Sequence, residues 1–167
     1  MDKRINRGDY YRMVTLAVAL RATCDRGKSG AIIVRDGRII SAGYVGSPSG
    51  VPHCDEEGHE METRYEKVVE QIRESRHCIR TVHAEMNAIL QAARYGPPIE
   101  GSDLFCTMFP CYDCAKAIVN VGIRKVHAFN DYQKSERSKA LFSRVGILWS
   151  IEDPEVIRYE ADPGKIS

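Results

Sequence analysis

The sequence has 167 residues, of which 24 are basic and 23 acidic, and this length is typical of one domain with a hydrophobic core. We expect residues 1–152 to form that domain and residues 153–167 to form a polar tail. The balanced charge gives no electrostatic footprint for nucleic acid, so no such partner is expected. There is no apolar run of membrane-spanning length and no signal-peptide pattern, so we expect a cytoplasmic protein without membrane contact. In that compartment the six cysteines favour metal binding over disulfides.

The N-terminal part of the chain predicts a helix followed by a β-hairpin. Apolar residues recur at helical spacing from Asp9 to Cys24, and the aspartate can cap the start of this helix. Residues 31–34 and 38–44 predict two strands, because Asp36-Gly37 between them is a strong signal for a type I′ turn. The buried stripe of the helix is expected to contain Tyr10, Met13, Val14, Ala17, Val18 and Ala22.

The middle of the chain is predicted as a loop between helices. Glycine, proline and serine residues from Gly46 to Gly58 indicate the loop. Glu60 to Ser75 is predicted as a weakly amphipathic helix on the surface. Glu85 to Tyr95 predicts a stronger helix that ends at Gly96-Pro97-Pro98. Its buried stripe should consist of Ala84, Ala88, Ile89 and Ala92.

The C-terminal part alternates strands with helices. Strands are expected at residues 104–108, 125–129 and 146–150, and helices at Cys111–Val121 and Ser135–Val145. Together with the hairpin, this order predicts an α/β fold of three layers, α/β/α, around a mixed sheet of five strands. A helix joins the last two strands, so we expect them to run parallel through a right-handed crossover.

Two short stretches, each at the start of a predicted helix, supply residues suited to a catalytic zinc. His83, Cys111 and Cys114 are nitrogen and thiolate ligands, and three protein ligands leave one coordination position open for water. Glu85 is then a carboxylate beside the metal that can move protons. His83 and Glu85 are two residues apart, so they can converge only if the pair straddles the start of a helix.

The combination of the two stretches is more specific than either alone. A Cys-x-x-Cys pair could also be a redox pair or half of a structural zinc site, and a single histidine is more often buried in the core than bound to a metal. However, His-x-Glu followed by Pro-Cys-x-x-Cys is the signature of zinc deaminases, in which the glutamate is an acid/base and not a ligand. We therefore predict Zn²⁺ as the cofactor and Glu85 as the catalytic residue.

The sequence resembles the deoxycytidylate (dCMP) deaminase family, in its bacterial and phage branch, within the cytidine deaminase superfamily. The resemblance extends from about Asp9 to Ile147. It implies a cytidine-deaminase-like fold and the hydrolytic deamination of dCMP to dUMP and ammonia, which feeds dTMP synthesis. It also implies a homo-hexamer with dCTP and dTTP as effectors. The stretches that carry it are Leu20-Arg21-Ala22-Thr23-Cys24, Gly43-Tyr44-Val45-Gly46, His53-Cys54, residues 80–89 and Phe109-Pro110-Cys111-Tyr112-Asp113-Cys114-Ala115-Lys116.

The resemblance also implies contacts with the substrate. The backbone N–H of Ala84 would hold the carbonyl of the base, and Tyr132 resembles an aromatic residue of the family that lies near the base. Val45 stands where the family usually has an asparagine that contacts the sugar. A valine side chain cannot make that hydrogen bond, so the base and sugar preferences, the regulation by dCTP or dTTP and the residues that bind phosphate stay open.

A second zinc is a further expectation from the family, because some of its members have a structural site. Relatives often carry cysteine where this chain has His59, an exchange that a zinc-ligand position tolerates. The ligands here would be Cys24, Cys54, His59 and Cys78, with His53 and His77 as rival ligands. The alternative is that these residues are ordinary core or surface residues.

Two other functions are weighed against dCMP deamination. The same chemistry could serve a modified deoxycytidylate, a free nucleoside or adenosine in tRNA, although the balanced charge argues against tRNA. In a different class, the chain could be a catalytically idle zinc module that serves as a binding or competence factor. The presence of Glu85 argues against this, because a structural zinc site does not need an unliganded carboxylate.

Overall fold

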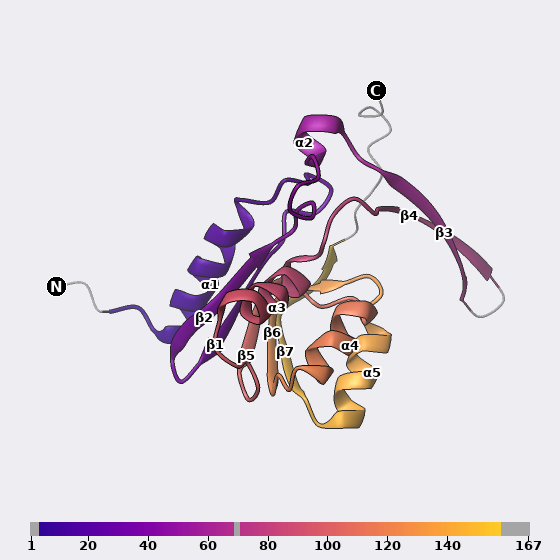
Figure 1. The fold of residues 1–167 in the computed structure, drawn as a ribbon. Helices are drawn as coiled ribbons and strands as arrows, with labels where there is room; N and C mark the ends of the chain where they lie inside the picture. Colours follow the sequence, from indigo (N-terminus) through magenta and orange to yellow (C-terminus); the bar gives the residue numbers. More distant parts are fainter. Residues whose placement is uncertain (1–3, 69–70, 158–167) are drawn as a thin grey trace.

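The computed structural model describes residues 4–68 and 71–157, and a mixed sheet of five strands lies at its centre (Figure 1). The strand order is β2-β1-β5-β6-β7. β1 is antiparallel to both β2 and β5, whereas β5, β6 and β7 run parallel to one another. The predicted fold class, including the parallel last pair, is therefore confirmed. The strand bounds are β1 Gly30–Arg35, β2 Arg38–Tyr44, β5 Asp103–Met108, β6 Lys125–Tyr132 and β7 Leu148–Ile157.

Helices cover both faces of the sheet and create two separate cores (Figure 1). On one face, α1 (Arg7–Ala19) packs Tyr11 against Phe105, with ring centroids 4.9 Å apart. The larger core lies on the other face, under α3 (Ala84–Tyr95), α4 (Tyr112–Asn120) and α5 (Glu136–Val145). α3 begins beside β2, and α4 follows β5 directly, so the starts of both helices lie near the sheet. No helix in the described ranges combines the length and apolar character needed to cross a bilayer.

The first hairpin follows the sequence prediction closely. Asp36 and Gly37 both have positive φ angles, 51° and 74°, as a type I′ turn requires. α3 also begins and ends within a residue of the predicted bounds, and its predicted stripe of four residues is buried. α4 and α5 differ from the predictions by about one residue at their starts, because Cys111 and Ser135 are N-caps rather than helical residues.

The face of α1 that contacts the sheet was predicted only in part, since Val14 and Val18 of the expected stripe pack against the core. The structure buries Tyr11, Thr15 and Ala19, whereas Tyr10 and Met13 from the predicted stripe are 45% and 60% exposed. Apolar residues lie on both faces of this helix, so periodicity does not distinguish them. Thr15 can lie in the core because its hydroxyl donates to the carbonyl of Tyr11 at 2.8 Å.

Both ends of α1 also differ from the prediction. The N-cap is Asn6, whose side chain accepts a hydrogen bond from the backbone N–H of Asp9 at 2.9 Å, so the cap is not Asp9 itself. The helix ends at Ala19 rather than Cys24, and the chain then turns away through residues 20–24. Because the helix ends early, Cys24 lies outside it and packs with Cys54 and Cys78.

The predicted surface helix from Glu60 to Ser75 is wrong, because the segment forms an antiparallel hairpin. β3 (Met61–Val68) pairs with β4 (Gln71–Cys78) in unbroken register from Met61↔Cys78 to Val68↔Gln71. Its sequence alternates charged residues with isolated Thr, Tyr, Val and Ile, and a weak helical stripe of this kind gives little preference over a polar strand. The hairpin projects from the body beyond α4 and α5 (Figure 1).

Two other segments contain more regular structure than expected. The loop from Gly46 to Gly58 contains one helical turn, α2 (Cys54–Glu57), which starts where the backbone N–H of His53 donates to Glu56 Oε2 at 2.8 Å. The last strand extends to Ile157 and therefore passes residue 153, where the polar tail was expected to begin. It is an edge strand with exposed residues, so it lacks an apolar pattern. Residues 158–167 of the expected tail lie outside the described residues.

Candidate active site

The two predicted catalytic stretches meet at the starts of α3 and α4. His83 is the N-cap of α3 and Cys111 is the N-cap of α4, both with extended backbone, while Glu85 lies in the first turn of α3. The pair His83 and Glu85 thus straddles a helix start. Two helix N-termini point toward one site, and their partial positive charge favours thiolate ligands.

The three candidate ligand atoms have the spacing of a zinc site. Nδ1 of His83 lies 3.3 Å from Sγ of Cys111 and 3.5 Å from Sγ of Cys114. Ligands held at about 2.0–2.3 Å from one tetrahedral zinc lie roughly 3.5 Å from each other, so the donor set fits the ion. Three ligands leave the fourth position open. His83 is exposed and Cys114 is buried, so the site opens to one side.

The ionisable groups of the cluster strongly influence one another. The hydrogen bond with Cys114, followed by that with His83, lowers the pKa of the Cys111 thiol to about 4. The hydrogen bond with Cys111 raises the pKa of His83 to about 9. Burial raises the pKa of Glu85 to about 7, and the carboxyl lies 3.9 Å from Sγ of Cys114. A carboxyl with a pKa near neutrality can both accept and donate protons.

The strand β2 fixes the position of α3. The hydroxyl of Ser41 donates to the carbonyl of Ala88 at 2.6 Å, and the side-chain amide of Asn87 donates to the carbonyl of Tyr44 at 2.8 Å. Gly43 lies between these contacts, and a Cβ there would be 2.3 Å from the backbone nitrogen of Ala88. Only glycine allows this close approach.

Replacement of Gly43 by alanine should therefore displace α3 and destabilise the fold by ~1–3 kcal/mol or more. Thermal unfolding measures the loss, and zinc content measures the displacement of His83. Gly8→Ala is the matched control, because its Cβ would lie 3.2 Å from only a side-chain oxygen of Asn6 and alanine favours a helix. Equal unfolding temperatures for the two variants would contradict this account of Gly43.

The three candidate substrate contacts have different surroundings. Ala84 is buried in the first turn of α3, and Tyr132 lies at the end of β6, half-buried against the larger core. Val45 is 7% exposed and packs with Cys24 and Cys54. Its neighbour Gly46 pairs with Val82 in an isolated β-bridge, so the segment that contains Val45 is held next to His83.

Tyr132 is supported by a largely buried ion pair that the sequence did not indicate. The ammonium of Lys139 lies 2.7 Å from Oδ2 of Asp131, and their side chains are 18% and 12% exposed. Oδ1 of Asp131 accepts the backbone N–H of Tyr132 at 2.8 Å. Because the pair joins β6 to α5, it holds the end of β6 in place beside the site.

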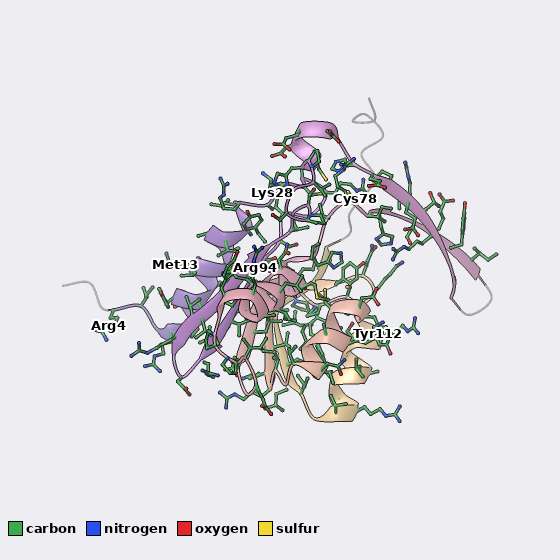
Figure 2. All side chains as sticks on the ribbon, viewed as in Figure 1. Arg4, Met13, Lys28, Cys78, Arg94 and Tyr112 are labelled. Carbon is green, nitrogen blue, oxygen red and sulfur yellow. The ribbon has the colours of Figure 1, made fainter. Side chains whose placement is uncertain are left out.

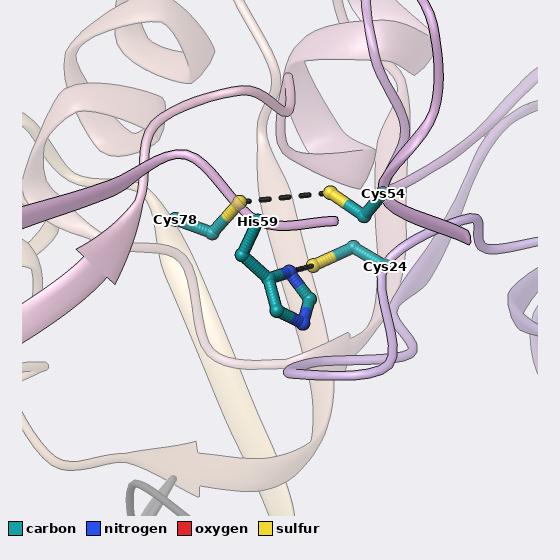
Figure 3. Close-up of side chains that lie close together, drawn as sticks. All are labelled: Cys24, Cys54, His59 and Cys78. Atoms are coloured by element: carbon teal, nitrogen blue, oxygen red, sulfur yellow. Dashed lines mark hydrogen bonds between the residues drawn. The ribbon is translucent and has the colours of Figure 1, made fainter. Parts of the chain in front are cut away.

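A second cluster of ligands forms about the base of the hairpin. The ligand atoms of Cys24, Cys54, His59 and Cys78 all lie within 4.8 Å of one another. Sγ of Cys54 is 3.6 Å from Sγ of Cys78, and Sγ of Cys24 is 3.7 Å from Nδ1 of His59 (Figure 3). Four such ligands make a closed set that suits structural zinc. The early end of α1 and the two ends of the hairpin bring these residues together.

The structure distinguishes His59 from the two rival histidines. Nδ1 of His53 bonds to the hydroxyl of Thr23 at 3.0 Å, and Nε2 of His77 bonds to the hydroxyl of Ser75 at 3.1 Å. Neither histidine belongs to the cluster. All six cysteines, which lie within the described residues, are free thiols.

Asp25 is a residue of this cluster that sequence reasoning missed. Its Oδ1 lies 2.9 Å from Nε2 of His59, on the side of the ring away from Cys24. A carboxylate behind a metal-binding histidine fixes the ring and leaves the other nitrogen free to bind the metal. The only sequence signal was an aspartate next to Cys24, and its partner is distant in the chain.

One face of the β3–β4 hairpin contacts the connection between β6 and α5. Opposed residues of an antiparallel pair share a face, so Arg64 and Ser75 lie together with Glu62 and His77. The ammonium of Lys134, which follows Tyr132 in the β6–α5 connection, donates to the hydroxyl of Ser75 at 2.9 Å. This face, called the inward face below, therefore contacts the segment that follows Tyr132. Figure 2 shows side chains along the hairpin and the body beneath it.

Asp113 links the inward face to the catalytic cluster. The hydrogen bond from Lys116 is the largest cause that holds the pKa of Asp113 below its usual range, and the charges of Arg64 and His83 add to it. Asp113 lies between Cys111 and Cys114 on α4. Arg64 is thus within electrostatic reach of the helix that carries two of the candidate zinc ligands.

Comparison with known proteins defines the class. Residues 6–130 match the family model of the cytidine and deoxycytidylate deaminase zinc-binding region, and the chain belongs to this family of zinc-dependent deaminases. The chain is 39% identical to ComE operon protein 2 of Bacillus subtilis over 145 residues, which cover 87% of this chain and 70% of that protein. It is 36% identical over 149 residues to the deoxycytidylate deaminase of Enterobacteria phage T2, with 74% and 79% of the two chains covered.

A solved structure agrees with the sequence relatives. The dCMP deaminase from cyanophage S-TIM5, in complex with dCMP and dUMP, has a TM-score of 0.70 and 28% sequence identity to this chain. The match covers 90% of this chain and 99% of the phage protein. The predicted family, the fold and the zinc cofactor are therefore confirmed.

Proposed function

We propose that the protein is a zinc-dependent dCMP deaminase, which hydrolyses dCMP to dUMP and ammonia and thereby feeds dTMP synthesis. The observation that carries this proposal is the convergence of His83, Cys111 and Cys114, with the buried carboxyl of Glu85 beside them. The similarity to phage deoxycytidylate deaminases supports dCMP as the substrate.

Each residue of the cluster has a role in the proposed reaction. His83, Cys111 and Cys114 hold the zinc, which when bound activates water as a nucleophile near neutral pH. Glu85 accepts a proton from the attacking water and delivers it to the ring nitrogen of cytosine as C4 is attacked. It then takes the second water proton from the hydroxyl at C4 and passes it to the amine, which leaves as ammonia while the C4 carbonyl forms. Burial raises the pKa of Glu85 to about 7, so this carboxyl can both accept and donate a proton near neutral pH.

Three further residues shape the base and sugar pockets in this proposal. The backbone N–H of Ala84, at the start of α3, has no carbonyl partner within the helix and is suited to the carbonyl of the base. Tyr132 borders the base, with its backbone held by Asp131. Val45 lines the sugar side as an apolar wall, where it offers contact but no hydrogen bond.

We also propose that Cys24, Cys54, His59 and Cys78 hold a second, structural zinc, with Asp25 orienting His59. Support comes from the four converging ligand atoms and the carboxylate behind the imidazole. The cluster joins the end of α1, the segment at α2 and both ends of the hairpin. A zinc there orders a region that has little apolar core of its own.

We further propose that the protein assembles as a homo-hexamer in the cytoplasm. Its effectors would be dCTP and dTTP. The outward face of α1 presents Tyr10, Met13, Leu16 and Leu20, which are 39–79% exposed. An apolar surface of this kind is typical of a protein contact, and it supports assembly. The free thiols support a reducing compartment.

A substrate panel with ammonia as the readout tests the function. dCMP should be turned over with the highest kcat/KM, ahead of deoxycytidine, CMP, modified deoxycytidylates and a tRNA adenosine substrate. Turnover of another substrate in preference to dCMP would assign the chemistry to that substrate. A protein with a full zinc content and no turnover of any of them would be a zinc module without catalysis, and the proposal would be wrong.

A further inference from the structure

We propose that the inward face of the β3–β4 hairpin, together with Lys134, forms the subsite for the 5′-phosphate of the nucleotide substrate. The residues that bind the phosphate are Arg64, Ser75, His77 and Lys134. This inference rests on the proposed function, because it names the group by which that site distinguishes a nucleotide from a nucleoside.

The register of the hairpin places these side chains on one face. Arg64 is opposite Ser75, and His77 is opposite Glu62, and opposed residues of an antiparallel pair point to the same side. Cys78 and Arg76 point to the other side. One face therefore serves the second ligand cluster through Cys78, while the other faces the body.

The contacts of this face join it to the segment that follows Tyr132. Lys134 donates to Ser75 at 2.9 Å, and Ser75 is in turn 3.1 Å from Nε2 of His77. Lys134 is two residues beyond Tyr132, the candidate contact for the base. A nucleotide with its base at Glu85 and Tyr132 would extend its sugar and phosphate toward this network.

The chemistry of the face suits a phosphate dianion. Nε and Nη2 of Arg64 lie 3.1 and 3.3 Å from the two carboxylate oxygens of Glu62. That is the forked geometry with which arginine also binds two phosphate oxygens. The Arg64–Glu62 pair is about half exposed, so it contributes little to stability, and a dianion can replace the carboxylate. Glu62 lies on this face, and Asp113, whose pKa the charge of Arg64 helps to lower, is paired with Lys116 at 2.7 Å.

The test compares a phosphorylated ligand with its unphosphorylated counterpart. Arg64→Gln and Lys134→Met should each lower kcat/KM for dCMP by about 10- to 100-fold, which is the usual effect of losing a hydrogen bond to a charged group. The kcat/KM for deoxycytidine, which has no phosphate, should stay unchanged. Calorimetry with dUMP and deoxyuridine should show the same loss of preference without turnover. Arg76→Gln removes an exposed cation from the opposite face of the same strand and should change neither ratio.

The outcomes separate this inference from the proposed function. If the wild type deaminates dCMP but Arg64→Gln and Lys134→Met keep its preference for dCMP over deoxycytidine, the phosphate subsite is wrong and the function stands. If Arg76→Gln loses the preference equally, the effect is general electrostatics and the subsite is again wrong. If dCMP is not a substrate, yet the preference for dUMP over deoxyuridine is lost in Arg64→Gln and Lys134→Met and kept in Arg76→Gln, the function is wrong and the subsite stands. Zinc content and circular dichroism confirm that each variant is folded.

Discussion

Replacement of Glu85 by glutamine should leave the fold and zinc content unchanged while lowering kcat for dCMP by at least ~10²–10⁴-fold. Glutamine has nearly the same shape and fits the buried site, but it cannot accept or carry a proton. The reduction should exceed the usual range for a single acid/base because, in the proposed reaction, Glu85 serves the attacking water, the ring nitrogen and the departing amine in turn. Steady-state kinetics and metal analysis of the same sample measure both quantities.

The wild-type enzyme should also show a matching pH dependence. The pKa of Glu85 is raised to about 7 by burial, so the carboxylate is lost as pH falls through that value, and kcat/KM should fall with it. The positive charge of bound zinc favours the carboxylate and moves the midpoint downward. The control is Glu100→Gln, an exposed glutamate outside the site, which should keep wild-type kinetics. Near-native turnover in Glu85→Gln would show that another group carries the protons.

The second large effect is expected at the other cluster. Wild-type protein should contain about two zinc ions per chain, and Cys54→Ser about one, because the closed set of four ligands loses one member. Structural zinc contributes up to ~10–16 kcal/mol in small zinc peptides. Even a loss of a few kcal/mol would lower the unfolding temperature by roughly 10 °C in a chain of this size. Metal analysis and calorimetry measure both changes.

Two controls sharpen the zinc experiment. Cys106→Ala alters a buried cysteine of the core that belongs to neither cluster, so it should keep both zinc ions. Asp25→Asn preserves shape but weakens the partner of His59, and it should reduce zinc affinity at this cluster by ~10–100-fold. Should wild-type protein hold one zinc, or Cys54→Ser keep the wild-type content and stability, the second site does not exist.

The catalytic cluster could be predicted from the sequence because its chemistry is local. His83 and Glu85 belong to one helix start, as do Cys111 and Cys114, so spacing alone constrains each pair. The core strands were predictable for a similar reason, since they are short, apolar and bounded by turns. Only the resemblance to a deaminase family indicated that the two helix starts lie together in the fold.

The parts that were missed depend on contacts between distant segments. β3 and β4 consist largely of charged residues, so their pairing, and not a hydrophobic pattern, determines their structure. α1 carries apolar residues on two faces, and only the sheet decides that Tyr11 rather than Tyr10 is buried. The contact between Asp25 and His59, and that between Lys134 and Ser75, join segments far apart in the chain.

The position of His59 and Cys78 at the two ends of the hairpin has a thermodynamic consequence. A metal held by both residues acts as a removable crosslink that fixes where the hairpin leaves the body, and with it the placement of Arg64. If phosphate binding uses that placement, nucleotide and metal are linked ligands, and each must raise the affinity of the other by the same factor. Saturating dUMP should then slow the removal of one zinc by a chelator, and loss of that zinc should weaken the binding of dUMP.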